Sequence, residues 1–180
     1  MENWGEGMGK GLVIVLTGDG KGKTTSALGM ALRAAGQGLK VLVLQFVKGG
    51  NLYGEHRALE RIEGIHVRSL GLGMLLNSPH SLEEHREKAR VALGEARKAM
   101  LSGDCQMLIL DEVLFAVQAG LLEEEDVLGL IREKPEELHL VLTGRGATPA
   151  IVEAADTVTE MVSCKHHHEH VGAPVRGTDF

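Results

Sequence analysis

The chain has 180 residues, of which 43% are hydrophobic and 24% charged, a balance typical of one globular domain with a buried core. Its 19 Lys and Arg against 25 Asp and Glu give a net charge of −6, which argues against a nucleic-acid partner. No apolar run approaches the roughly 18 residues of a membrane span, and residues 1–10 lack the apolar core of a signal peptide. The two cysteines match no metal or redox spacing. We therefore expect a soluble, cytoplasmic protein without a membrane partner.

Apolar runs along the chain predict an α/β fold with a mostly parallel sheet. Most of the runs are continuously apolar, which suits strands that are covered on both faces. Because these runs alternate with helical patterns, parallel strands joined by right-handed crossovers are expected. The six expected strands, the last of them weaker, are Leu12–Leu16, Val41–Phe46, His66–Leu70, Met107–Leu110, Leu138–Leu142 and Thr157–Val162.

Helix signals fall between the expected strands. Apolar spacing from Leu28 to Ala35 predicts a helix that Gly36 stops. Residues 81–84 form a capping box, which opens a long helix that ends near Gly103. A shorter helix is expected around residues 127–131, and Thr148-Pro149 begins another. With no linker or repeat in the chain, we expect a flexible arm over residues 1–10 and a single phosphate-loop domain over residues 11–180.

The first expected strand runs into Thr17-Gly18-Asp19-Gly20-Lys21-Gly22-Lys23-Thr24-Thr25, and a helix follows at once. This order is typical of a phosphate-binding loop, because the glycines let N–H groups point at phosphate oxygens and the helix adds its positive end. Lys23 supplies a mobile positive charge, and Thr24 is placed to ligate Mg²⁺. Thr17 stands where the general pattern has glycine. A glycine-rich turn without a ligand is the alternative, and Gly-Lys-Thr-Thr at this junction favours nucleotide binding over it.

The fourth expected strand ends in two adjacent acids, Asp111 and Glu112. Such a pair lies at the carboxyl edge of the sheet, where ligands bind in open α/β folds. We expect this strand to neighbour the one that precedes the phosphate loop. One acid would hold Mg²⁺ or its water, and the other would cap the helix that follows. A solvated acidic pair is the alternative. Patterns of serine hydrolases and protein kinases are absent from the sequence.

These segments together resemble the ATP:corrinoid adenosyltransferases of bacterial cobalamin synthesis and salvage. The phosphate loop of that family reads Thr-Gly-Asn-Gly-Lys-Gly-Lys-Thr-Thr, which residues 17–25 match with Asp19 in place of asparagine, so Thr17 is normal there. The likeness extends from about residue 10 to the end. Further matching segments are Gln45-Phe46-Val47-Lys48-Gly49, Leu110-Asp111-Glu112, Thr143-Gly144-Arg145-Gly146, Ala155-Asp156-Thr157-Val158-Thr159-Glu160-Met161 and Lys165-His166.

The resemblance implies transfer of the 5′-deoxyadenosyl group of ATP to the cobalt of a reduced corrinoid. Cobalt(I) attacks the ribose C5′ and the whole triphosphate departs. ATP then lies in the opposite sense to most phosphate-loop enzymes, so that C5′ is exposed. No general base is required, because cobalt(I) carries no proton to remove. The protein would position the two reactants and neutralise the leaving triphosphate. The family also implies a homodimer and a flavoprotein reductase that supplies electrons.

The resemblance also assigns residues to the site. Lys23 would be the principal cation at the triphosphate. Thr24 and Glu112 would hold Mg²⁺ with support from Asp111, so catalysis is expected to depend on Lys23, Thr24 and Glu112. Arg145 is either a phosphate ligand or a structural arginine that bonds local carbonyls. The residues expected to bind ATP are Gly18, Asp19, Gly20, Lys21, Gly22, Lys23, Thr24 and Thr25.

The corrinoid side departs from the family pattern. After the third strand the family has Gly-Phe-x-Trp, whose rings press on the corrin and displace its lower axial ligand, and this eases reduction of cobalt(II). Here the stretch reads Gly73-Met74-Leu75-Leu76. Met74 and Leu76 are expected to contact the corrinoid instead, since a thioether chain fills irregular gaps well. Packing of both residues in the core is the alternative. Some members also carry an N-terminal helix over the site; here a lid would come from elsewhere, or from Trp4.

Three further hypotheses complete the reading of the sequence. The histidine-rich run over residues 165–170 is expected to be a solvated polar turn rather than a transition-metal site. A phosphate-loop kinase or ATPase that acts at the γ-phosphorus is a rival function, with ADP or phosphate as its product. A non-catalytic, ATP-dependent switch or corrinoid carrier is the other rival, and it would form no cobalt–carbon bond.

Overall fold

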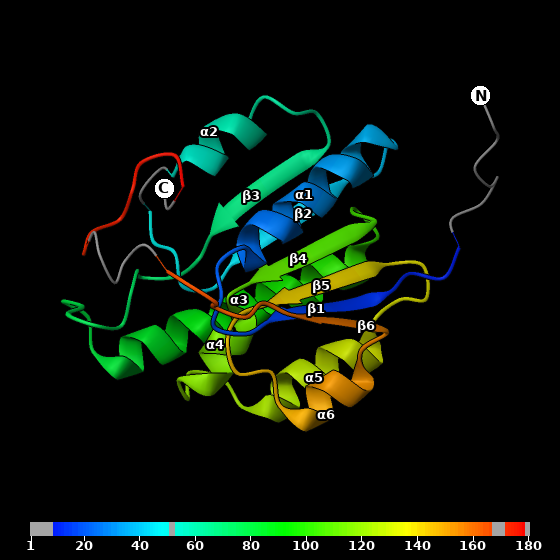
Figure 1. Cartoon of the computed structure of the whole chain (residues 1–180). Helices are drawn as coiled ribbons and strands as arrows, with labels where there is room; N and C mark the ends of the chain where they lie inside the picture. Colours follow the sequence, from blue (N-terminus) through cyan, green and yellow to red (C-terminus); the bar gives the residue numbers. More distant parts are fainter. Residues whose placement is uncertain (1–8, 51–52, 167–171, 179–180) are drawn as a thin grey trace.

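A computed structural model describes residues 9–50, 53–166 and 172–178. Its strands form one fully parallel sheet in the order β3-β2-β4-β5-β1-β6 (Figure 1). All six expected strands are confirmed, with ends shifted by one or two residues. The strands are β1 (Val13–Thr17), β2 (Val41–Gln45), β3 (Ile65–Ser69), β4 (Met107–Asp111), β5 (His139–Thr143) and β6 (Thr157–Glu160). The helices are α1 (Lys23–Gly36), α2 (Gly54–Leu59), α3 (Leu82–Ser102), α4 (Val113–Gln118), α5 (Glu124–Glu133) and α6 (Pro149–Ala154).

Local capping explains where the predicted helices begin and end. The Ser81 hydroxyl accepts the Glu84 N–H at 3.2 Å, and the Glu84 carboxylate accepts the Ser81 N–H at 2.7 Å, so the expected capping box opens α3. Gly103 ends α3 in a left-handed conformation with φ of 73°. At α6, the Thr148 hydroxyl accepts the Ile151 N–H. Helix α4 is the helix that was expected after the acidic pair, whereas α2 was not predicted, because its six residues are too few to display a helical period.

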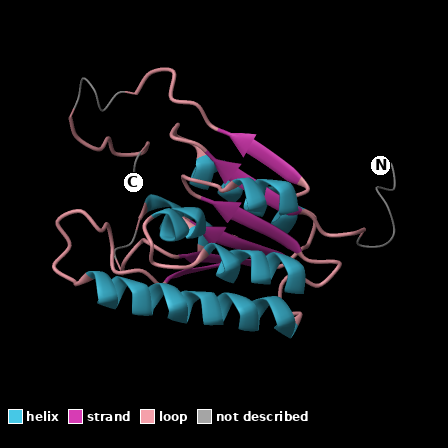
Figure 2. Cartoon of the chain, turned by 90° about the horizontal axis from the view of Figure 1, so that it is seen from below, coloured by secondary structure: helices cyan, strands magenta, loops and turns pink. Residues whose placement is uncertain are grey.

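The core lies in two layers, one on each face of the sheet. Helix α1 covers one face with Ala27, Ala31 and Ala34, whose small side chains let the helix approach the strands closely. Helices α3 to α6 cover the other face (Figure 1), and Figure 2 shows the helices lying alongside the strands. Successive residues of β4 alternate between the layers: Ile109 faces the α1 side and Leu108 the α3 side. This two-sided burial explains the continuously apolar strand sequences.

Every strand ends in a polar residue at one edge of the sheet. Since all strands are parallel, these residues gather where the loops that carry the expected site also lie. The expectation that the acidic strand β4 neighbours β1, the strand before the phosphate loop, was wrong, because β5 lies between them. Apolar runs identify strands but carry no information on their lateral order. The last residues of the six strands are Thr17, Gln45, Ser69, Asp111, Thr143 and Glu160.

Some expectations concern residues that the structure does not describe. Most of the expected arm over residues 1–10, with Trp4, lies outside the described residues, as do residues 167–170 of the histidine-rich run. Within the described part of the chain, no helix is both long and apolar enough to cross a bilayer. The same residues contain no group of three or more His, Cys, Asp or Glu side chains that could hold a metal ion.

The turn after β5 gives a test of this packing. Gly144 has a φ of 138°, and a Cβ at this position would lie 2.5 Å from the Phe115 backbone nitrogen in α4. We expect Gly144→Ala to lower the free energy of unfolding by about 3 kcal/mol, because both the backbone conformation and the close approach exclude a side chain. Urea denaturation measures the change.

The exposed Gly94 in α3 provides the control, since no described atom apart from the adjoining residues and nearby backbone of its own helix lies within 4 Å of a Cβ built there. Gly94→Ala should raise the free energy of unfolding by about 0.5–1 kcal/mol through helix propensity. If Gly144→Ala unfolded at the same urea concentration as the wild type, the close approach of β5 and α4 would be refuted.

Candidate functional site

The phosphate loop connects β1 to α1 and packs against Met161, the residue that follows β6. Gly18 and Gly22 have φ values of 95° and 112°, which a residue with a side chain rarely adopts. The Gly20 N–H donates to the Met161 carbonyl at 2.7 Å, and the Met161 N–H donates to the Thr17 carbonyl at 2.8 Å. A Cβ on Gly18 would lie 2.4 Å from the Met161 carbonyl oxygen. The glycines therefore serve both the turn and the close contact with residue 161.

Lys23 begins α1 and its ammonium group lies inside the loop. The side chain is buried, and Nζ donates to the carbonyls of Gly18 at 2.7 Å and Gly20 at 2.9 Å. Burial lowers the pKa of Lys23 below its ordinary value, and the negative charge of Glu112 opposes part of this shift. The two loop carbonyls thus hold the Lys23 ammonium group inside the turn between β1 and α1.

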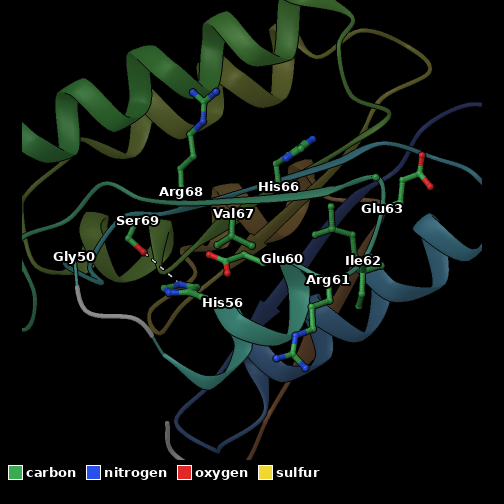
Figure 3. A pocket seen from close by; sticks show the side chains of 12 residues that line it. Gly50, His56, Glu60, Arg61, Ile62, Glu63, His66, Val67, Arg68 and Ser69 are labelled. Atoms are coloured by element: carbon green, nitrogen blue, oxygen red, sulfur yellow. Dashed lines mark hydrogen bonds between the residues drawn. The ribbon is translucent and has the colours of Figure 1, made fainter.

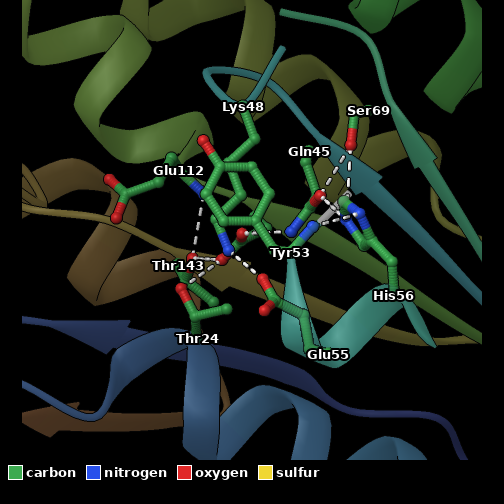
Figure 4. A network of polar contacts seen from close by, with 10 residues as sticks. Thr24, Gln45, Lys48, Tyr53, Glu55, His56, Ser69, Glu112 and Thr143 are labelled. Atoms are coloured by element: carbon green, nitrogen blue, oxygen red, sulfur yellow. Dashed lines mark hydrogen bonds and ion pairs between the residues drawn. The ribbon is translucent and has the colours of Figure 1, made fainter. Parts of the chain in front are cut away.

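The Asp111 carboxylate joins the phosphate-loop helix to the centre of the sheet. Asp111 ends β4 and is 1% exposed. Its Oδ1 accepts the hydroxyl protons of Thr24, at 2.7 Å, and Thr143, at 2.9 Å, while its Oδ2 accepts from Gln45 Nε2 at 3.1 Å (Figure 4). Three donors from α1, β5 and β2 thus compensate for the burial of this carboxylate.

The hydrogen-bond network continues from Gln45 into α2. Gln45 Oε1 lies 2.6 Å from His56 Nε2 and accepts the Ser69 hydroxyl at 2.8 Å (Figure 4). The Tyr53 N–H donates to His56 Nδ1 at 3.3 Å, so in a neutral imidazole the proton lies on Nε2 and is donated to Gln45. These contacts orient the Gln45 amide. Its carbonyl oxygen faces His56 and Ser69, and its NH₂ group faces Asp111.

Glu112 occupies a strained position beside this network. Its φ of 62° places it in the left-handed region, and its N–H donates to Thr143 Oγ1 at 2.9 Å. Burial raises the pKa of Glu112, and the Asp111 charge adds to this effect against the opposing charge of Lys23. Within the described residues, the Glu112 side chain makes no capping hydrogen bond, although the residue precedes α4. Since Asp111 is committed to the network as well, the expectation that one acid caps the next helix was wrong.

Arg145 lies beside the phosphate loop. Its Nη1 is 3.5 Å from Asp19 Oδ1, and both side chains are largely exposed, so this ion pair adds little stability. The loop that carries Arg145 is held at the site by the Ala147 N–H, which donates to Thr17 Oγ1 at 3.3 Å. The hydroxyl of Thr17, at the position where other phosphate loops have glycine, thus anchors the arginine loop.

A cavity of about 670 Å³ opens next to the loop. Both expected metal ligands, Thr24 and Glu112, line it together with Lys23. Its far side is formed by α2 and by residues 177–178, where Thr178 accepts a hydrogen bond from Lys21 Nζ at 3.2 Å. The charged and hydroxyl side chains on its walls are Lys21, Lys23, Thr24, Thr25, Lys48, Glu55, Glu112 and Thr178.

A second, apolar cavity of about 440 Å³ lies at the same edge of the sheet. It is lined by Val47, Met74, Leu75, Leu76 and Phe115. Met74 and Leu76 are 72% and 76% exposed, so the alternative that they pack in the core is wrong. Leu75 instead packs against the core between them. Phe115 was not expected here, although it is one of only five aromatic residues and follows the acidic pair closely.

A third cavity, of about 810 Å³, follows the outer edge of β3 and α2 (Figure 3). Two of the residues that line it, His56 and Ser69, belong to the hydrogen-bond network, and Figure 3 shows the contact between them. The phosphate loop does not line this cavity. Among the described residues, the cavity therefore touches the site only through His56 and Ser69 of the hydrogen-bond network.

Sequence reasoning missed several of the residues that form this site. Gln45, Lys48 and Thr143 were noted only as parts of matching segments, and His56 and Glu55 were not noted at all. A polar residue directly after a buried strand is the one signal that could have indicated Gln45 and Thr143. His56 and Glu55 lie in the short helix α2, which carried no signal.

Comparison with known proteins agrees with this geometry. A family model described as ATP:corrinoid adenosyltransferase BtuR/CobO/CobP matches residues 9–180. A corrinoid adenosyltransferase of Pseudomonas aeruginosa is 38% identical over 172 residues, which are 95% of this chain and 84% of that protein. The corrinoid adenosyltransferase CobA of Salmonella typhimurium is 36% identical over 172 residues, 95% and 86% of the two chains.

Among solved structures, a KaiC-like protein of Pyrococcus horikoshii superposes with a TM-score of 0.53. The match covers 85% of this chain and 73% of that one at 18% identity, so it supports the fold alone. The family match, in contrast, spans the phosphate loop, the acidic strand end and the arginine loop. With these elements gathered at one edge of its sheet, the chain belongs to the ATP:corrinoid adenosyltransferase family.

Proposed function

We propose that this chain transfers the 5′-deoxyadenosyl group of ATP to cobalt(I) of a reduced corrinoid and releases inorganic triphosphate. The observation that carries the proposal is the adjacency of a charged cavity and an apolar cavity at one sheet edge. Neighbouring residues after β2 contribute to both, since Val47 lines the apolar cavity and Lys48 the charged one. After β4, Phe115 and Glu112 are divided in the same way. A triphosphate and a corrin ring can therefore be held side by side.

The reaction requires no proton transfer from the protein. The lone pair of cobalt(I) forms the cobalt–carbon bond at C5′, the C5′–oxygen bond breaks, and its electron pair leaves with the triphosphate. Residues 18–25 would cradle that triphosphate with backbone N–H groups. Lys23 would exchange its two carbonyl partners for phosphate oxygens and so stabilise the charge of the leaving group. Arg145, which forms an ion pair with Asp19 of the loop, would add a second positive charge.

We propose Thr24 and Glu112 as the protein ligands of Mg²⁺, with Asp111 as the residue that orients Thr24. Because the Thr24 hydroxyl proton is donated to Asp111, the lone pairs of its oxygen are directed away from that carboxylate. A hydroxyl and one carboxylate fit Mg²⁺, which keeps several waters and takes its remaining ligands from phosphates. When bound, the ion would offset negative charge on the triphosphate.

The apolar cavity is proposed as the corrinoid side of the site. Met74 and Leu76, exposed where the family has Phe and Trp, would lie against one face of the corrin, and Phe115 would supply a ring from α4. The proposal includes a single domain over residues 11–180 and, on family likeness alone, a homodimer and a flavoprotein reductase.

The reaction itself is tested with MgATP and chemically reduced cob(I)alamin under anaerobic conditions. We expect the light-sensitive absorption spectrum of adenosylcobalamin to develop, with inorganic triphosphate as the co-product. ADP or inorganic phosphate as the product would instead favour a kinase or ATPase. ATP binding without a cobalt–carbon bond, also with precursor corrinoids, would favour the switch or carrier.

Glu112→Gln should separate stability from activity. Since burial and Asp111 raise the pKa of Glu112 in the folded state, ionised Glu112 costs stability that the neutral carboxyl does not. The wild type should lose stability as the pH rises through this raised pKa. The variant should not, and at neutral pH its free energy of unfolding should be about 1 kcal/mol higher.

The same variant should lower kcat/KM for MgATP by about 100-fold, because a ligand charge is removed. Unfolding at several pH values and steady-state kinetics measure the two effects. Glu153→Gln, on the exposed surface of α6, is the control and should change neither. Wild-type activity of Glu112→Gln would argue against Glu112 as a metal ligand.

Charged substitutions test the corrinoid side. We expect Met74→Glu and Leu76→Glu each to raise KM for the corrinoid by about 10-fold or more, because apolar contact with the corrin is lost. The affinity for ATP, measured by calorimetry, should stay unchanged. Leu101→Glu, at an exposed position of α3, is the matched control. An unchanged KM for the corrinoid in both variants would place the corrin elsewhere.

A further inference from the structure

Lys48 lies in the loop that follows β2, and its side chain lines the charged cavity of about 670 Å³. Its Nζ forms an ion pair with Glu55 Oε1 at the start of α2 and lies 4.8 Å from the centroid of the Tyr53 ring (Figure 4). Both partners of the ion pair are largely buried, with 23% and 20% of their side chains exposed. The proposed function uses Lys48 only as a residue that lines the charged cavity, which it shares with Lys23.

The charges around this cavity leave room for another cation. The departing triphosphate carries more negative charge than one ammonium group and one divalent cation offset. Arg145 is largely exposed to water, which weakens its attraction for phosphate. Lys48 is better shielded, with 23% of its side chain exposed, and it lines the same cavity as Glu112 and Lys23. A triphosphate that fills this cavity would therefore meet its ammonium group.

Lys48 holds Glu55 in its charged form. Burial by itself would raise the pKa of Glu55, but the hydrogen bond and charge of Lys48 outweigh burial and leave this pKa lowered. The carboxylate is thus an anion at the mouth of a cavity that is proposed to receive an anion. A lysine ammonium has three N–H donors on a flexible stem, so it can turn from Glu55 to phosphate oxygens.

We propose that Lys48 is a further cationic ligand of the triphosphate, besides Lys23 and Arg145, and that Glu55 and the Tyr53 ring hold it at the cavity mouth until the nucleotide binds. This inference rests on the proposed function, since it requires a triphosphate in that cavity. A purely structural role is the alternative, in which the ion pair only ties the loop after β2 to α2. The two roles predict different results for the two halves of the pair.

Calorimetric titration with inorganic triphosphate and Mg²⁺ distinguishes these roles. Lys48→Met should weaken triphosphate binding by about 10- to 100-fold, because a charged hydrogen bond is lost. Glu55→Gln should bind triphosphate at least as tightly as the wild type, because a competing anion is removed while Lys48 remains. A structural ion pair predicts that both variants weaken binding and lower the melting temperature alike. That result would overturn the proposal.

Two further comparisons separate this inference from the proposed function. Lys23→Met is expected to abolish triphosphate binding. If the wild type itself bound no triphosphate, the proposed function would fail and the role of Lys48 with it. If Lys23→Met lost binding while Lys48→Met bound like the wild type, only the role of Lys48 would fail. Should Lys48→Met not fold, Glu55→Gln remains decisive, since weaker triphosphate binding in that variant contradicts the proposal.

Discussion

The site depends on one buried anion, the Asp111 carboxylate at the centre of the sheet edge. A carboxylate that is 1% exposed is tolerated only if its oxygens receive hydrogen bonds. Those bonds come from Thr24, Thr143 and Gln45, and therefore from α1, β5 and β2. The strand order places β4 between β2 and β5, in a register that sets Gln45 beside Asp111. Satisfying this single charge thus fixes the phosphate-loop helix to the middle of the sheet and orients the Thr24 hydroxyl.

Two short segments each contribute to both cavities, which are proposed to receive two very different reactants. After β2, Val47 contributes to the apolar cavity and Lys48 to the charged one; after β4, Phe115 and Glu112 are divided in the same way. Because the strands are parallel and end together, two loops suffice to bring the charged cavity next to the apolar cavity. The strained backbone of Glu112 and the raised pKa of its carboxyl are a local loss of stability at a site with a proposed metal role.

Much of the fold was predictable from the sequence, and the reason is local. Buried strands require apolar runs, and α3 required the Ser81 cap at one end and Gly103 at the other, so these signals lie within a few residues of what they specify. Helix α2 was missed because six residues carry too little pattern, and it holds both Glu55 and His56. The capping role expected for an acid was wrong because the left-handed backbone at Glu112 could not be anticipated from residue type.

The sequence by itself determined the chemistry of the loop: glycines, Lys23 and Thr24 at a strand–helix junction specify a phosphate cradle through backbone geometry that spans only a few residues. It also determined the family, because many short motifs occur in one order. Only the tertiary structure decided that β5 separates the loop strand from the acidic strand, that Met74 and Leu76 are exposed, and that Lys48 meets Glu55. These facts depend on the lateral order of strands and on contacts between separate elements. They follow from the packing of the whole chain, which no local pattern encodes.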